Sequence, residues 1–370
     1  MNRKQKKLVL GVFIAAVVMI LAVFGTMAMR KNKKQEQTSG PVSTSGVTTS
    51  DTTPVPTKNP HEGMVKSELT GQWIKKSVAG NRCFAIMINN IEYAFRNQMG
   101  TSKADIIYEA LAEGGITRML ALYQNVKDVK RIGSVRSARH YYVQFAKEWD
   151  AVFCHFGHTK YAVAKMEKLG TENLSGLSGI GPVVYARTSS LRAPHNVFTS
   201  GKKMLKGAKK LGYKVKKTNS AVAEHFDFNE QDTVLAGGTK AKDIVLPFSY
   251  YSTCRMKYSA KKKKYMKYEY GQKHMDRYYK KQLSFKNVIV QLVEESNIDR
   301  NGYQTMKLGN VSGKGYYFTN GRRIKITWQR NEKRNTMVYL DASGNTLKIN
   351  PGKTYIAVYP SNRKKYIRVK

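Results

Sequence analysis

Acidic residues are scarce in this 370-residue chain. It contains 25 Asp and Glu against 65 Lys and Arg, which gives a formal net charge of +40 at pH 7. Such an excess attracts polyanions and repels other cations, but it says nothing about the fold. The candidate partners are therefore nucleic acid, anionic lipid and phosphate-rich wall polymers. Which of them applies depends on the side of the membrane that the chain faces.

Cysteine is also rare. The three cysteines, Cys83, Cys154 and Cys254, are widely spaced and form no CxxC pair. Because an odd number cannot all pair within one chain, a framework of disulfides is not expected. We expect three small, buried, apolar side chains instead.

Several catalytic signatures are missing. The sequence has no GxxxxGK[ST], no HExxH, no GxSxG and no GxGxxG after a strand, which argues against P-loop ATPases, zincins, α/β-hydrolases and dinucleotide-binding enzymes. His155 and His158 could ligate a metal, but two histidines in a loop are a weak signal. We therefore expect neither a metal nor a cofactor.

One long apolar run stands near the N-terminus. Residues 8–29 are 22 positions without a charge, and about 20 are needed to cross the hydrocarbon core. We predict an uncleaved signal anchor, with a cleaved signal peptide as the alternative. Four basic residues precede the run and four follow it, so flanking charge does not fix the orientation.

The segment after the apolar run is rich in Ser, Thr, Gly and Pro and cannot bury enough surface to fold. A short basic tail, an apolar helix, a spacer and a folded body are typical of surface-exposed proteins. We therefore predict a cell-membrane, single-pass protein with an extracytoplasmic body. The predicted parts are a cytoplasmic tail at 1–7, a transmembrane anchor at 8–29 and a disordered linker at 30–75.

Residues 76–222 are predicted to form an N-terminal mixed α/β domain, because strand and helix patterns alternate there. The expected strands are 83–89, 105–110, 116–123 and 151–156, and the expected helices are 134–149, 159–169 and 199–211. With Ser134 as N-cap, Arg136 and Arg139 would share one face of the first helix turns.

Residues 223–370 are predicted to form a smaller, mostly antiparallel β domain. A hairpin is expected around 254–270, a central strand at 287–293, a hairpin turn at Asn320-Gly321 and another turn at 341–345. Lysines and tyrosines are interleaved over 255–281. That pattern can bind single-stranded nucleic acid or sugar polymers, or it can protect a sheet edge from aggregation.

A set of polar residues in the first region is the candidate site. Several follow predicted strands, where α/β sheets place their ligands. Arginine forks suit a carboxylate or phosphate, and a His with a Glu can act in acid–base catalysis. The catalytic candidates are Glu113 and His195. The ligand-binding candidates are Asn90, Glu109, Arg118, Arg136, Arg139, His155 and Asn196. Alternatively, the arginines pair with Glu109 or Glu113 and serve the structure.

At these residues the sequence resembles the YerB-like family of bacterial lipoproteins. The resemblance rests on INN (88–90), ADIIYEALAEGGITR (104–118), GSVRSAR (133–139) and APHNVFTS (193–200), and it continues through YYFTNGRRIKITW (316–328). It implies a two-domain extracytoplasmic protein of Gram-positive-type bacteria, with a domain of unknown function and no established activity. Many members carry a lipobox cysteine. No cysteine precedes Cys83 here, so the apolar helix would have to be the anchor.

We expect a binding module that recognises an anionic envelope polymer or a small anionic ligand, with a strong dependence on salt. The second hypothesis is an envelope hydrolase or transferase, in which Glu113 and His195 exchange protons and the arginines hold an anion. A nucleic-acid-binding protein facing the cytoplasm is the third, and an external body disfavours it. Arg139→Ala should abolish ligand binding with little loss of folding. A large drop in melting temperature would instead identify a structural ion pair.

Overall fold

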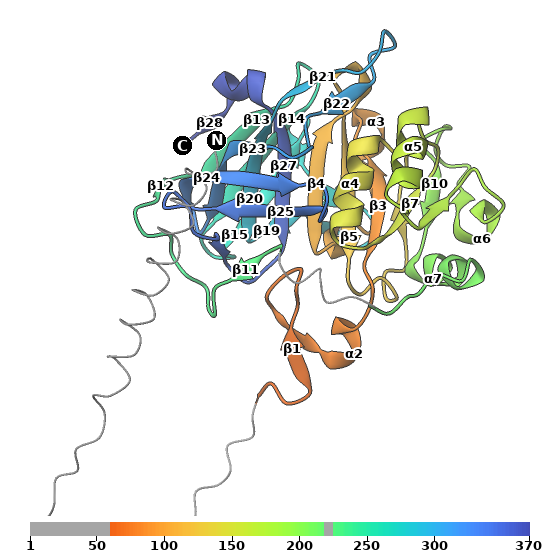
Figure 1. Ribbon diagram of the computed structural model, residues 1–370, viewed down its shortest axis with the longest axis horizontal. Coiled ribbons are helices and arrows are strands. Elements are labelled where there is room, and N and C mark those ends of the chain that lie inside the picture. The colour runs from red at the N-terminus through yellow and green to blue at the C-terminus, as the bar shows by residue number, and fades with distance from the viewer. Residues whose placement is uncertain (1–59, 218–224) are drawn as a thin grey trace, which may run out of the picture. The chain divides into compact units, whose positions relative to one another are not determined.

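The computed structural model describes residues 60–217 and 225–370. Its largest element is a sheet of eleven strands (Figure 1). The predicted cytoplasmic tail and the predicted anchor at 8–29 lie outside these residues. Within the described ranges, every helix is too short or too polar to cross a bilayer.

The large sheet joins the two predicted domains. Its order is β12-β24-β23-β20-β27-β4-β5-β3-β7-β8, with β25 paired to β24. The strands are β12 (Thr239–Lys240), β24 (Arg322–Asn331), β25 (Thr336–Leu340), β23 (Ser312–Thr319), β20 (Asn287–Val293), β27 (Thr354–Pro360), β4 (Ile106–Leu111), β5 (Thr117–Tyr123), β3 (Phe84–Asn89), β7 (Val152–His155) and β8 (Asn173–Ser175).

The junction lies between β27 and β4, which pair in parallel from Thr354 opposite Ile106 to Val358 opposite Ala110. β20 also pairs in parallel with β27, and all residues of these three strands are buried. Such continuous apolar runs are typical of strands covered on both faces. The prediction of a central strand at 287–293 is therefore confirmed, and main-chain hydrogen bonds cross the predicted boundary at 222–223.

A second sheet of six strands comes entirely from the C-terminal half. Its order is β16-β15-β14-β13-β28, with β19 paired to β15. The strands are β13 (Asp243–Pro247), β14 (Thr253–Ser259), β15 (Lys264–Glu269), β16 (Gln272–Lys273), β19 (Ser284–Phe285) and β28 (Arg368–Val369). All its pairs are antiparallel. An α/β N-terminal part followed by a mostly antiparallel part confirms the predicted fold class.

Most of the helices lie beside the strands of the large sheet that come from the N-terminal region (Figure 1). The described helices are α2 (Lys76–Ala79), α3 (Glu92–Phe95), α4 (His140–Glu148), α5 (Lys160–Lys168), α6 (Gly181–Val184) and α7 (Gly201–Lys210), with 3-10 turns η1 (Thr101–Lys103), η2 (Glu113–Gly115) and η4 (Ser361–Tyr366). α4 is buried along most of its length, and its Tyr142 hydroxyl donates to the Arg118 carbonyl of β5. This contact holds α4 against the sheet.

The predicted helix at 134–149 is wrong over its first six residues, because α4 begins only at His140. Residues 134–139 are taken up by pairing with other strands. The Asn89 N–H donates to the Ser134 carbonyl, and the Arg136 N–H donates to the Met87 carbonyl. These tertiary hydrogen bonds override a local helix pattern. Arg136 and Arg139 therefore lie on extended chain and do not share a helix face.

The predicted linker also ends earlier than expected. β1 (Met64–Lys66) and β2 (Trp73–Lys75) form a hairpin within the range assigned to disorder. Leu69 between them is fully buried in the core, and the Ser67 hydroxyl bonds the Gln124 side chain at 2.6 Å. A single buried leucine beside a hydrogen-bonded serine leaves too short a pattern in the sequence to distinguish this hairpin from a disordered linker.

The remaining small sheets are short. They are formed by β6 (Ile132–Gly133), β9 (Ala186–Arg187) and β10 (Val197–Thr199), by β11 (Asp227–Phe228) with β26 (Lys348–Ile349), by β17 (Met275–Asp276) with β18 (Lys281–Gln282), and by β21 (Glu295–Asn297) with β22 (Gln304–Met306).

Two local predictions are confirmed. Asn320 and Gly321 have φ of 50° and 71° at the turn between β23 and β24, as a two-residue type I′ hairpin requires. Cys83, Cys154 and Cys254 are all buried and free of disulfides.

Candidate functional site

Two segments carry many cations and no carboxylates. Residues 129–139 contain four Lys and Arg, residues 186–203 contain four more, and neither segment has an Asp or Glu. We call the eight side chains the basic ribbon: Lys130, Arg131, Arg136, Arg139, Arg187, Arg192, Lys202 and Lys203.

The small sheet β6-β10-β9 brings the two segments together. Phe198 of β10 pairs with Gly133 of β6, and the Val135 N–H extends this pairing by donating to the Val197 carbonyl. The first segment also lies beside the last residues of β3, through the hydrogen bond to Ser134. The ribbon therefore reaches the carboxyl end of a strand in the large sheet, where α/β proteins commonly place ligands.

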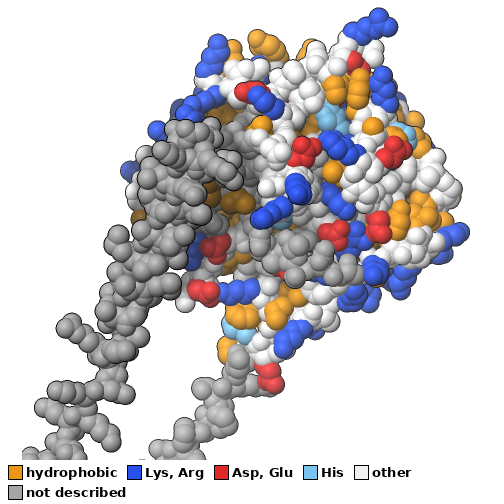
Figure 2. Space-filling model, viewed as in Figure 1, with side chains coloured by type: hydrophobic (Ala, Val, Ile, Leu, Met, Phe, Trp, Pro, Cys, Tyr) orange, Lys and Arg blue, Asp and Glu red, His pale blue; other side chains and the backbone are white. Residues whose placement is uncertain are grey.

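A cavity of about 430 Å³ opens at one end of the ribbon. Its charged lining consists of Lys130, Arg131, Arg187 and Lys203, and no carboxylate lines it. Side-chain hydroxyls complete the lining: Thr188, Ser189, Thr199 and Ser200. Helix α7 begins at this wall with Ser200 as N-cap, and Figure 2 shows Lys and Arg side chains gathered over α7 at the lower right. Cations and hydroxyl donors without acceptor charges suit an anion.

Glu113 holds the opposite end of the ribbon. Its Oε2 accepts from Arg139 Nε at 2.8 Å, and its Oε1 accepts from both Arg139 and Arg118. Partial burial alone would raise the pKa of Glu113, but the charges of the two arginines outweigh burial and lower it to about 2. Here the alternative of a structural ion pair applies, and Glu113 stays ionised near neutral pH.

Arg136 has no such carboxylate. Its Nη1 makes only a long contact of 3.4 Å with the Pro194 carbonyl, and its buried Nε has no hydrogen-bond partner in the described structure. Burial lowers the pKa of Arg136, the Glu113 charge opposes this, and the Arg139 charge adds to it. Glu113 therefore pairs with Arg118 and Arg139 but not with Arg136, which leaves an excess of positive charge.

His195 lies at the ribbon but away from Glu113. Its Nδ1 is 2.9 Å from the Asn89 amide nitrogen, and its ring meets Tyr93 edge-on at 5.2 Å. Burial and then the charges of Arg136 and Arg192 lower the pKa of His195. No hydrogen bond joins His195 to Glu113 among the described residues, and neither Arg139 nor His195 lines the cavity at the ribbon. Acid–base catalysis by Glu113 and His195 therefore stays a prediction, and no contact between the two side chains supports it.

Asn90 and Glu109 lie in the core instead. Lys267 of β15 reaches Glu109 at 3.0 Å and also bonds Glu269, and all three side chains are fully buried. Glu109 additionally accepts hydrogen bonds from Asn90 at 3.1 Å and from the Tyr355 hydroxyl at 2.8 Å. We call Lys267, Glu109, Glu269 and their partners Asn90 and Tyr355 the buried charge network. It joins β4 to the second sheet and is closed to solvent.

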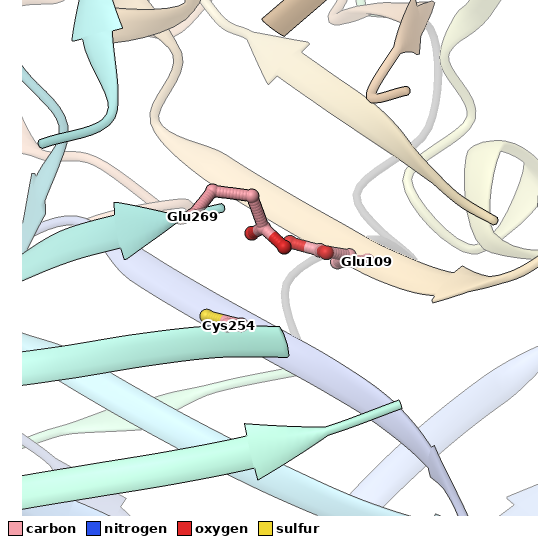
Figure 3. Close-up of side chains that lie close together, drawn as sticks. All are labelled: Glu109, Cys254 and Glu269. Atoms are coloured by element: carbon pink, nitrogen blue, oxygen red, sulfur yellow. The ribbon is translucent and has the colours of Figure 1, made fainter. Parts of the chain in front are cut away.

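This network raises the question of a metal. Figure 3 shows the carboxylates of Glu109 and Glu269 directed toward one another, with Cys254 nearby, and one ligand atom from each lies within 4.8 Å of the others. The Lys267 ammonium already bonds both carboxylates. Burial also raises the pKa of the Cys254 thiol, and only a thiolate ligates strongly. The residues therefore fit a buried ion network better than a metal site.

His155 and Asn196 make contacts that hold the backbone. His155 is fully buried, with Nδ1 2.8 Å from the Gly157 carbonyl and Nε2 3.2 Å from Asn173. Burial, the largest influence, lowers the pKa of His155 to about 4. Asn196 accepts from Arg187 at 2.7 Å and donates to the Thr188 carbonyl. It thereby shapes the loop that carries the cavity-lining arginine.

The predicted residues thus separate into three groups. Arg118, Arg136, Arg139, Glu113 and His195 lie at the ribbon, while Asn90 and Glu109 lie in the buried charge network, and His155 and Asn196 support the loops. Sequence reasoning missed Lys130, Arg131, Arg187 and Arg192. The detectable signal was the absence of carboxylates from two segments that lie about 50 positions apart.

Comparisons with known proteins bear on this arrangement. Residues 69–214 match the family described as "Protein of unknown function (DUF3048) N-terminal domain", and residues 244–356 match its C-terminal domain. Over 301 residues the chain is 32% identical to "Putative lipoprotein YerB" of Bacillus subtilis (strain 168), covering 80% of this chain and 86% of that protein. It also resembles the crystal structure of YerB protein from Bacillus subtilis, with a TM-score of 0.72, 29% identity and coverage of 83% and 99% of the two chains.

Proposed function

Because this chain belongs to the DUF3048, YerB-like family of unknown function, we propose that it is a membrane-anchored extracytoplasmic protein whose basic ribbon binds an anionic polymer of the cell envelope. The description of its relative as a lipoprotein supports the location at the membrane. The apolar run at 8–29 would supply a single-pass anchor in place of a lipid.

The observation that carries the proposal is the charge imbalance of the ribbon. Eight cations stand on two paired segments that contain no carboxylate, and Glu113 pairs with only one of them, Arg139. Four of the others line a single cavity. Like charges held close together repel one another, which costs folding free energy. A bound polyanion would neutralise that repulsion, so the imbalance favours binding over a purely structural role.

The length of the ribbon favours a polymer over a single small anion. From Lys130 to Arg139 the chain advances nine positions, which spans up to about 30 Å when extended. The cavity occupies only one end of it. A polymer with repeating negative charges could contact the cavity and Arg136 together, whereas a small anion would fill the cavity alone.

The experiment measures binding of the full-length protein to inorganic polyphosphate as the probe. Lys130→Gln combined with Lys203→Gln removes two exposed cations that line the cavity and make no ion pair within the described structure. Each contact with an exposed charge contributes up to about 1 kcal/mol, so we expect affinity to fall roughly 3- to 20-fold. Binding should also weaken steeply as salt is raised.

The matched control is Lys206→Gln combined with Lys209→Gln. It removes the same charge from two exposed positions of α7, the helix that carries Lys203, and neither position lines the cavity. Polyphosphate affinity should stay within about twofold of the unchanged protein. Equal losses in the two double variants would show that only net charge matters, and the ribbon would then not be a site.

A further inference from the structure

Two adjacent tyrosines project from the loop between β13 and β14. Tyr250 is 92% exposed and Tyr251 is 73% exposed. Folding does not require such exposure, since a tyrosine ring is stabilised by burial. The loop is nevertheless well fixed, because the Ser249 hydroxyl donates to the Gly115 carbonyl and accepts from the Tyr251 and Ser252 N–H groups at 3.0 Å. The backbone that carries the two exposed rings is therefore held in place by hydrogen bonds.

This loop lies against the end of the basic ribbon. A Cβ added to Gly115 would meet Tyr251 at 3.1 Å, so the absent side chain makes room for the ring. Gly115 closes the η2 turn that carries Glu113, and Glu113 bonds Arg139, the last cation of the ribbon. The aromatic pair therefore lies beside the end of the ribbon at which Arg139 pairs with Glu113, although the two elements are far apart in sequence.

Cations also accompany the tyrosines. The Arg363 guanidinium lies 5.4 Å from the centre of the Tyr250 ring. The Arg139 guanidinium lies 5.5 Å from the centre of the Tyr303 ring. Aromatic faces placed among cations bind polyanions whose repeating units contain rings, because the rings stack while the charges pair.

Resting on the proposed function above, we propose that the bound polymer is an anionic glycan, whose sugar rings stack on Tyr250 and Tyr251 while its charged groups pair with the ribbon. A row of cations by itself selects ligands only by their negative charge. The exposed rings add a preference for ring-bearing units. The neighbours of the two tyrosines are Ser249 and Ser252, which lack the apolar surface that insertion into a lipid bilayer requires.

The experiment compares matched carboxylate polymers on the full-length protein. Polygalacturonate bears its carboxylates on sugar rings, and polyglutamate bears them on a chain without rings. Tyr250→Ala should weaken polygalacturonate binding about tenfold, as expected for the loss of one stacked ring. Binding of polyglutamate and of inorganic polyphosphate should stay within about twofold. Tyr250→Phe keeps the ring and should restore polygalacturonate binding.

The possible failures are distinguishable. Equal weakening of polygalacturonate and polyglutamate by Tyr250→Ala, or no weakening of either, would overturn the glycan inference and leave the ribbon in place. So would tighter, Tyr250-dependent binding of oligo-dT, which would favour nucleic acid. If none of these polymers binds more weakly to the Lys130/Lys203 double variant than to its control, the proposed function itself fails.

Discussion

The buried charge network and the basic ribbon differ in how their positive charges are paired. In the network a single ammonium, Lys267, contacts two carboxylates, Glu109 and Glu269, and all three are fully buried. In the ribbon eight cations lie on two paired segments that contain no carboxylate, and Glu113 meets them only at one end. A buried charge must be paired because its desolvation costs much free energy. An exposed charge is hydrated by water, so it can remain unpaired within the protein and bind an external ligand.

The comparison teaches where to look for function in a strongly basic protein. Arg330 and Glu148 form another fully buried ion pair, so the buried cations Lys267 and Arg330 both contact carboxylates. What marks the ribbon is its local lack of carboxylates, together with a cavity of about 430 Å³.

The largest effect should come from breaking the network. Lys267→Met leaves two carboxylates buried without their cation, and we expect a loss of about 3–5 kcal/mol in the free energy of unfolding. Denaturant titration of the full-length protein measures it. Lys203→Met in the ribbon is the control, and the free energy of unfolding should change by no more than about 0.5 kcal/mol. Similar changes in the free energy of unfolding for Lys267→Met and Lys203→Met would contradict the difference between the buried charge network and the basic ribbon.

An intermediate effect is expected where the ribbon meets Glu113. Arg139→Ala removes a two-pronged interaction with Glu113, and hydrogen bonds to charged groups contribute about 1.5–3 kcal/mol. The free energy of unfolding should fall by about 2 kcal/mol, contrary to the expectation from the sequence of little loss of folding.

Arg136→Ala provides the comparison for Arg139, since Arg136 has only a long contact with the Pro194 carbonyl. Its free energy of unfolding should fall by less than about 1 kcal/mol. If Arg136→Ala destabilised the protein as much as Arg139→Ala, the structure would depend on both arginines, and the surplus of positive charge assigned to Arg136 would be in question.

A pH dependence with opposite signs is expected at two carboxyls. Burial and the nearby Glu109 charge raise the pKa of Glu269 to about 7, above the value of about 4.3 for a free glutamate. Its contribution to stability is therefore largest in acid and declines as pH rises from about 4.3 through 7. For Glu113, whose folded-state pKa is about 2, the contribution is full above about 4.3 and is lost as pH falls toward 2.

Unfolding titrations of the single variants between pH 3 and pH 8 test these signs. Glu113→Gln should flatten the stability profile below about pH 4.3, and Glu269→Gln should flatten it between about 4.3 and 7. The prediction fails if Glu269→Gln flattens the acid side instead.

Much of the fold could be predicted from the sequence. The buried strands at 84–89, 106–111 and 287–293 are continuous apolar runs, and their positions were predicted to within a residue or two. The prediction of a helix over 134–139 was wrong, because hydrogen bonds to Met87 and Asn89 hold that backbone outside α4. The YerB-like resemblance is confirmed by the 32% identical relative from Bacillus subtilis.

The candidate site was predictable only in part. Arg136 and Arg139 were singled out because their type suits anions, and they lie on the ribbon. Asn90 and Glu109 were singled out for the same reason but are buried with Lys267. Residue type indicates what a side chain can bind. It does not indicate whether the partner comes from the protein or from solvent.

The sequence by itself determined the apolar strands, the hairpin at Asn320-Gly321 and the large excess of positive charge. Only the tertiary structure decided which charges are neutralised inside the protein. Glu109 and Tyr355 are 246 positions apart and hydrogen-bonded, and the two segments of the ribbon meet only through β6 and β10. The energy of a charge depends on its distance to other charges and on its exposure to water, and both are properties of the folded chain.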